Sequence, residues 1–262
     1  MIIFSLAFTL WSVVRNTGVQ TLGVRIAAAY LSKEWKTEVR IRSFSLNPWD
    51  GLVINDLSLK DHKGEYAISA KELSVRPGII SFKKHRINLE KVFIDQGIFQ
   101  LLVHKGDTSL NIQPFIDYFA TKDTTRKADT VKGRPWELTI SNIILNSTRF
   151  HFENENSERV PIGMDYANID VKEINLQMTD LRFDADTIRA NIRDLSARER
   201  SGFHVKHLSG EFHVSPGYLK ANHLKVLTDN SDLSLSFAFL YPGWIAYKTS
   251  DSFHEMAGCR RS

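Results

Sequence analysis

Apolar and polar residues alternate along most of the chain after Thr37. Two runs are the most regular, and their apolar positions are Ile188, Ala190 and Ile192 in one and Leu233, Leu235, Phe237 and Phe239 in the other. Strict alternation predicts a strand with one apolar and one polar face. Turn-forming residues such as Asp61 to Gly64 and Ser215 to Gly217 separate the runs. We therefore predict a mainly β chain with one curved, antiparallel-rich sheet over residues 37–240.

A short pattern recurs within these runs: a polar doublet followed by an apolar-polar-apolar step. It occurs as NDLSL (55–59), KELSV (71–75), EKVFI (90–94), SNIIL (141–145), KEINL (172–176) and, more loosely, RDLSA (193–197). Because the spacings vary, the pattern predicts an array of similar hairpins and not a strict solenoid. One internal helix is predicted over 111–120, where apolar residues share a face, and a polar linker follows over 121–134.

The pattern does not say what covers the apolar face. Two facing sheets would make a sandwich, closure would make a barrel, and an open trough would leave the apolar wall for another molecule. The residues alone leave these three architectures open. The same alternatives apply to the two most regular apolar runs. In a trough their side chains contact a ligand, and in a closed core they contact one another; the residues are Ile188, Ala190, Ile192 and the run from Leu233 to Phe239.

The first fourteen residues are uncharged and mostly apolar, which predicts a membrane anchor. The apolar positions are Ile2, Ile3, Phe4, Leu6, Phe8, Leu10, Trp11, Val13 and Val14. As a helix they would span about 21 Å, less than the ~30 Å hydrocarbon core, so a signal-peptide core or a buried helix are the alternatives. A signal peptide normally has a positive start and a nearby small-residue cleavage site, and both are missing here. We favour a membrane helix whose first residues are missing, followed by a surface helix ending near residue 35.

Charge and motifs add little chemistry. The chain has 34 Lys and Arg against 30 Asp and Glu, and the excess is scattered, which argues against nucleic-acid binding. The single Cys259 excludes an intramolecular disulfide. No GxSxG, HExxH, CxxC, P-loop or GxGxxG motif is present, so we predict no enzyme and no catalytic, cofactor-binding or metal residues.

Four histidines crowd the C-terminal part of the predicted sheet. They are His204, His207, His213 and His223. Their spacing is no standard zinc pattern, and we expect them on polar strand faces. His204 and His207 have opposite parity, so strict alternation predicts that they face opposite sides of the sheet.

Several segments resemble TamB-like proteins of the AsmA superfamily, in the form found in Bacteroidetes. The segments are VQTLGVRIAAAYLSKEWKTEVRIRSFSL (19–46), GLVINDLSLKDHKGEYAISAKELSV (51–75), SLNIQPFIDYFATKDT (109–124) and PWELTISNIILNSTRFHF (135–152). The resemblance rests on their order and spacing over about residues 15–240. It divides the chain into an anchor and juxtamembrane helix (1–35), two β-repeat regions (36–120 and 135–240) around the linker, and an atypical tail (241–262).

The resemblance implies an inner-membrane, single-pass protein with its bulk in the periplasm and no cofactor. In this family one-sided strands form an open β-trough, in which acyl chains of membrane lipids cover the apolar wall. A second hypothesis is an assembly factor for outer-membrane or secreted β-proteins that acts by strand augmentation, and a third is a passive spacer. The domain that meets the outer-membrane assembly machinery is absent, and the tail after Trp244 loses the alternation, so we expect a truncated or frame-shifted copy.

Overall fold

The structure is a computed structural model of the whole chain that describes residues 32, 37–47, 51–81, 84–114, 137–184 and 186–241. The predicted anchor, the linker and the tail after Tyr241 lie outside these residues. So do residues 115–120 of the predicted internal helix and all of the predicted surface helix except Ser32. In the described ranges, no helix is both long enough and apolar enough to span a bilayer.

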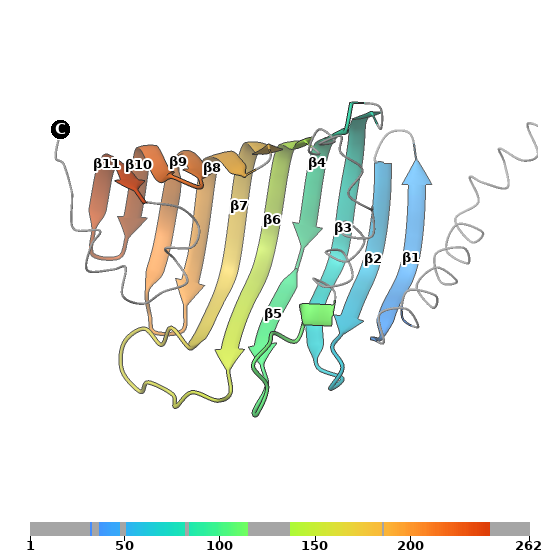
Figure 1. Cartoon of the computed structure of the whole chain (residues 1–262), viewed down its shortest axis with the longest axis horizontal. Coiled ribbons are helices and arrows are strands. Elements are labelled where there is room, and N and C mark those ends of the chain that lie inside the picture. The colour runs from blue at the N-terminus through green and yellow to red at the C-terminus, as the bar shows by residue number, and fades with distance from the viewer. Residues whose placement is uncertain are drawn as a thin grey trace, which may run out of the picture.

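Eleven strands make up most of the described residues, which confirms the mainly β class (Figure 1). Their bounds are β1 Val39–Asn47, β2 Gly51–Lys60, β3 Tyr66–Ser81, β4 Arg86–Asp95, β5 Ile98–Val103, β6 Glu137–Asn154, β7 Asn168–Asp184, β8 Thr187–Glu199, β9 His204–Ser215, β10 Tyr218–Thr228 and β11 Asp232–Leu240.

All eleven strands belong to one sheet. Its order follows the chain from β1 to β4 and from β6 to β11, and β5 pairs with both β3 and β6. The two β-rich regions predicted from the sequence are therefore parts of a single sheet. Most neighbours are antiparallel, as consecutive hairpins require, but β6 runs parallel to β4 and β5.

β4 and β5 are two parts of one strand line between β3 and β6. The break falls at Gln96, which has a φ of +49°, and at Gly97. A Cβ atom on Gly97 would lie 2.8 Å from Cγ2 of Ile94 and 3.3 Å from the side chain of Thr148, which is itself fully buried. A side chain at position 97 would therefore displace Ile94 of β4 and press against Thr148 of β6, which favours glycine at this break.

The recurring polar doublets are the points where the strands shift their alternation. Ile54 and Leu57 are three residues apart, with Asn55 and Asp56 between them. Both aliphatic side chains nevertheless pair with apolar residues of β3. Asp56 has a φ of +50°, and such an irregularity turns the strand so that a three-residue step returns to the same face. The doublets at 172–173 and 193–194 coincide with register shifts in the pairing of β7, β8 and β9.

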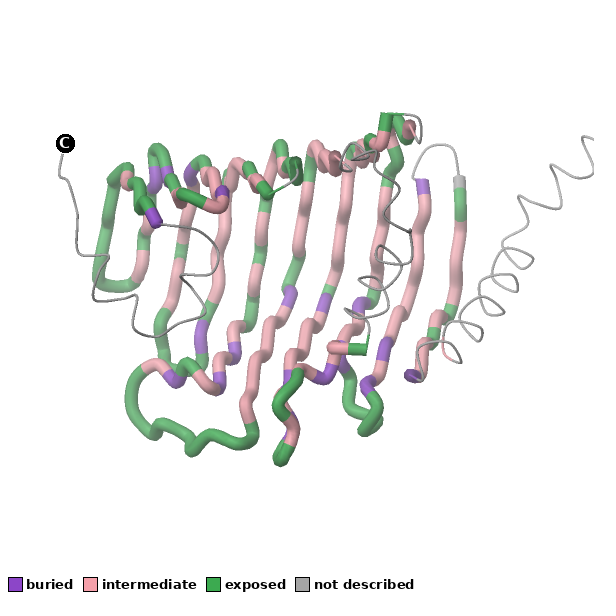
Figure 2. The backbone as a smooth tube through the Cα atoms, viewed as in Figure 1, coloured by how far each residue is buried: buried purple, intermediate pink, exposed green. Residues whose placement is uncertain are grey.

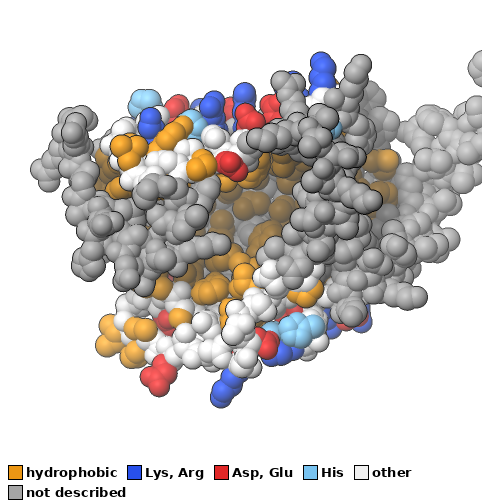
Figure 3. All heavy atoms as spheres, in the orientation of Figure 1, with side chains coloured by type: hydrophobic (Ala, Val, Ile, Leu, Met, Phe, Trp, Pro, Cys, Tyr) orange, Lys and Arg blue, Asp and Glu red, His pale blue; other side chains and the backbone are white. Residues whose placement is uncertain are grey.

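The sheet is strongly curved, and its hollowed side carries hydrophobic side chains between two polar rims (Figures 1 and 3). Bulges at matching levels of neighbouring strands increase the local twist and bending. Fully buried positions gather toward the lower ends of β2 to β8 and where Tyr241 packs against the turn between β9 and β10 (Figure 2). The middle of most strands is largely half-buried, whereas β11 is largely exposed.

Candidate functional site

The apolar side of the sheet is continuous from β1 to β11. Residues that pair across neighbouring strands share a face, so the pairing traces the surface strand by strand. Representative apolar pairs are Ile41 with Leu57, Leu57 with Ala70, Leu73 with Ile94, Ile94 with Leu145, Leu145 with Leu176, Leu176 with Leu195, Leu195 with Leu208, Leu208 with Val226, and Val226 with Leu233. A single apolar surface results, with no polar strand interrupting it.

The structure brings the two predicted apolar runs onto this same surface. Ile188, Ala190 and Ile192 of β8 pair with Val214, Phe212 and Gly210 of β9. Leu233, Leu235, Phe237 and Phe239 of β11 pair with Val226, Leu224, Ala221 and Leu219 of β10. Because β9 and β10 are neighbours, the two runs are parts of one patch at the C-terminal end of the sheet.

Most of this patch is not packed as a core would be. The exposed fractions of Leu233, Leu235 and Phe239 are 49%, 39% and 50%, and the three predicted residues of β8 and Phe237 are half-buried. Among the described residues, the fully buried hydrophobic side chains are Leu59, Ala67, Ala70, Leu102, Ala221, Leu224 and Tyr241. The apolar surface therefore keeps much of its area free for contact with another molecule.

At the lower rim, a buried ion-pair cluster joins the ends of three strands. Nε2 of His104, just after β5, lies 2.8 Å from Oδ2 of Asp61 in the β2–β3 turn. Its Nδ1 lies 3.3 Å from Oε1 of Glu155, just after β6. Asp61 also accepts hydrogen bonds from the backbone N–H groups of Lys63 and Glu65, each at 2.9 Å. The side chains of His104 and Asp61 are 5% and 0% exposed.

The electrostatics of this cluster favour an imidazolium between two carboxylates. Burial alone would raise the pKa of Asp61, but the hydrogen bond from His104 and the two backbone donors outweigh it, and the pKa falls below its usual value. Burial would lower the pKa of His104, but the hydrogen bonds to Asp61 and Glu155 raise it overall. With a proton on each ring nitrogen, His104 can donate to both carboxylates at once. We interpret the cluster as a tie between strand ends.

A second polar cluster follows along the same rim. Arg149 of β6 forms two hydrogen bonds to Asp170 of β7, at 2.7 and 2.9 Å, and the Asp170 side chain is only 8% exposed. Beside it, a carboxylate oxygen of Glu199 accepts from the backbone N–H of Ser201 at 2.5 Å. The buried carboxylates described along this rim, Asp61, Asp170 and Glu199, all have hydrogen-bond partners, which fixes their positions.

The structure places the four C-terminal histidines on strands and corrects one prediction about them. Val205 and Leu208 pair with Ala197 and Leu195, which lie two residues apart on one face of β8. The intervening bulge in β9 therefore resets the alternation, and His204 and His207 lie on the same polar face instead of opposite ones.

Their partners are separate. His204 contacts Asp229 at 3.2 Å, His207 contacts Asp194 at 2.6 Å, and His213 contacts Arg189 and Tyr218. Across the described ranges no group of three or more His, Cys, Asp or Glu is arranged to hold a metal ion.

Sequence reasoning found the apolar runs but missed the His104 cluster. The D-x-x-G turn marks Asp61 as a turn residue, but its partner His104 is 43 positions away. A buried histidine next to a turn carries no local signal of its own. Only the pairing of β5 with β3 brings the two residues together.

Comparisons with known proteins name no relative. No family model matches the chain, and no curated protein matches it.

Proposed function

We propose that this chain is a non-enzymatic lipid-handling protein of the cell envelope, in which acyl chains lie against the apolar face of the sheet. In this proposal the sheet is an open trough of a TamB-like bridge, anchored in the inner membrane by the N-terminal segment and extending into the periplasm. Lipids would move along the trough toward the outer membrane.

The observation that carries the proposal is an apolar surface that runs over all eleven strands and is only half-buried. Covering such a surface with hydrocarbon gains roughly 25 cal/mol for each Å² of apolar area removed from water. An acyl chain meets this need without requiring complementary side chains, because its contacts with leucine and phenylalanine are non-directional. Polar rims, such as the one that contains His104, leave lipid headgroups in contact with water.

The test uses the full chain, extracted in mild detergent and examined by native mass spectrometry. We expect phospholipid to co-purify with the wild-type chain. Leu235→Ser with Phe237→Ser should reduce the co-purified lipid several-fold while circular dichroism still shows a folded sheet. The matched control is Leu227→Ser, since Leu227 is a 40% exposed leucine that pairs with His207 outside the apolar surface.

Two results would count against the proposal. If these residues lay in a closed core, burying their new polar groups would cost several kcal/mol and the double variant would unfold. If the folded double variant kept its lipid as fully as the Leu227→Ser control does, the patch would not be a lipid contact.

A second candidate function is the assembly of outer-membrane or secreted β-proteins by strand augmentation. In the strand pairings of the described residues, β1 has β2 as its one neighbour and β11 has β10. An edge strand presents backbone donors and acceptors to which a further strand can pair. Captured β-peptides in the same mass spectra, in place of phospholipid, would favour this function. A passive spacer would carry neither.

A further inference from the structure

Four basic side chains form a row across the opposite, polar face of the sheet. Arg182 of β7 pairs directly with Arg189 of β8, Arg189 with His213 of β9, and His213 with Lys220 of β10. We call these four residues the basic row. Each alternates along its strand with residues of the apolar surface, so the basic row faces away from that surface.

Among the described residues, the two arginines of the basic row form no ion pair, unlike several other arginines of the sheet. Elsewhere in the sheet Arg149, Arg86 and Arg198 each form an ion pair with a carboxylate on a neighbouring strand. Within the part of the chain that the structure describes, neither Arg182 nor Arg189 has an ion-pair partner. Like charges directly opposite each other destabilise a sheet. The two guanidiniums therefore keep N–H donors that can contact an anion.

Neighbouring groups hold part of the basic row in place. Nε of Arg189 donates to Nε2 of His213 at 3.1 Å, and the hydroxyl of Tyr218 lies 3.0 Å from the same nitrogen. Lys220 lies over the ring of Tyr218, with its ammonium 4.8 Å from the centroid. Burial and the nearby charges of Arg189 and Lys220 lower the pKa of His213. The neutral ring can accept from Arg189, which keeps that guanidinium extended along the surface.

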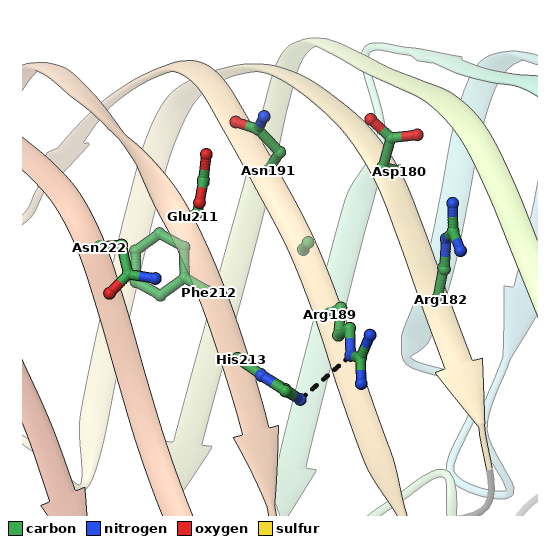
Figure 4. Close-up of a pocket in the computed structure, with 9 residues that line it drawn as sticks. Asp180, Arg182, Arg189, Asn191, Glu211, Phe212, His213 and Asn222 are labelled. Atoms are coloured by element: carbon green, nitrogen blue, oxygen red, sulfur yellow. Dashed lines mark hydrogen bonds between the residues drawn. The ribbon is translucent and has the colours of Figure 1, made fainter.

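Carboxylate and amide groups form the other half of the same hollow. Each lies two residues along its strand from a member of the basic row, and the four are Asp180, Asn191, Glu211 and Asn222. Figure 4 shows them on one side of the hollow, with Arg182, Arg189 and His213 on the other. The hollow has a volume of about 390 Å³. Two residues of strand separate the halves by about 6.6 Å.

We infer that this hollow binds a phosphate group that is linked to an amine by a short spacer. Two guanidiniums side by side match a phosphate, because each can donate two parallel N–H bonds to its oxygens. Asp180 and Glu211 then meet an ammonium group a few ångströms away. The chemistry is that of phosphoethanolamine, either as a free molecule or as the headgroup of a phospholipid. The hollow lies on the face opposite the proposed acyl-chain surface, so its test is independent of the lipid-handling proposal.

The test is titration calorimetry on the full chain in detergent, with phosphoethanolamine and inorganic phosphate as separate probes. We expect saturable binding of phosphoethanolamine. Arg182→Gln with Arg189→Gln should weaken the binding of both probes by at least about tenfold, since two charge-assisted contacts are lost. Asp180→Asn with Glu211→Gln should weaken phosphoethanolamine binding and leave phosphate binding equal or stronger. Asn tolerates the φ of +56° at position 180, so the bulge is kept.

The control is Arg76→Gln with Lys91→Gln, which removes another directly opposed pair of cations, on β3 and β4. Binding that does not saturate, or that falls as much in this control as in the Arg182 and Arg189 variant, would overturn the site. Equal losses for both probes in the Asp180 and Glu211 variant would overturn the amine half of the inference.

A final pair of measurements identifies the source of the ligand. Vesicles of phosphatidylcholine with phosphatidylethanolamine are compared with vesicles of phosphatidylcholine alone, for the wild-type chain and for Arg182→Gln with Arg189→Gln. A preference for phosphatidylethanolamine that the double variant loses assigns the lipid headgroup. Binding of soluble phosphoethanolamine without that preference assigns the free molecule.

Discussion

Replacing His104 with alanine tests whether the rim cluster ties the strand ends together. The change removes both the 2.8 Å contact to Asp61 and the 3.3 Å contact to Glu155. The Asp61 side chain is 0% exposed, and the substitution removes the cationic partner of its carboxylate. Breaking a buried pair by removing one partner costs about 3–5 kcal/mol. The backbone donors of Lys63 and Glu65 still stabilise the carboxylate, so we expect the lower end, about 3 kcal/mol.

The assay is urea unfolding at pH 6, followed by circular dichroism, with the free energy of unfolding taken from the midpoint and slope. The matched control is His204→Ala, which removes a histidine from an ion pair with Asp229, a residue whose side chain is 48% exposed. Asp229 stays in contact with water and keeps Lys206 as a partner at 3.0 Å, so the control should lose only about 0–1 kcal/mol. If His104→Ala loses no more stability than His204→Ala, the cluster is not the tie that the structure indicates.

Three further outcomes follow from the same contacts. The stability difference between the wild type and His104→Ala should be largest between about pH 4 and 6.5. This difference should shrink as pH rises through the raised pKa of His104, because the imidazolium is lost. It should also shrink as pH falls through the lowered pKa of Asp61, because the carboxylate is protonated. A flat difference in urea midpoints from pH 4 to 9 would contradict this. Asp170→Asn should lower the free energy of unfolding by about 1–2 kcal/mol, because the amide nitrogen cannot accept one of the two hydrogen bonds from Arg149 and the remaining one loses its charge; an unchanged melting temperature would refute the assignment. Gly97→Ala should cost about 1–3 kcal/mol, because the new methyl group would lie 2.8 Å from Ile94 and 3.3 Å from the buried Thr148 of β6. A folded chain of wild-type stability would mean that the break between β4 and β5 is not packed this tightly.

The amino-acid pattern by itself determined that this is a one-sided β protein. Alternation is a local property, because successive side chains of a strand point to opposite faces whatever the strand pairs with. The turns at Asp61 to Gly64 and at Ser215 to Gly217, and the apolar runs of β8 and β11, could therefore be predicted. The recurring polar doublets could also be recognised in the sequence, but their structural role could not be predicted. They mark positions where a bulge resets the alternation, and that can be recognised only when the apolar partners on both sides are known.

Tertiary structure decided which distant residues meet. Whether β6 lies parallel to β4 or pairs with another strand depends on the balance of contacts over the whole sheet, and no short segment encodes it. The parallel pairing of β5 with β6 places Glu155 beside His104, and the β9 bulge places His204 and His207 on one face. The basic row likewise exists only through register, since a shift by one residue in any of its four strands would move that side chain to the apolar face. The sequence specifies which side chains are present. Which of them form a cluster depends on the cross-strand register, which is a long-range property.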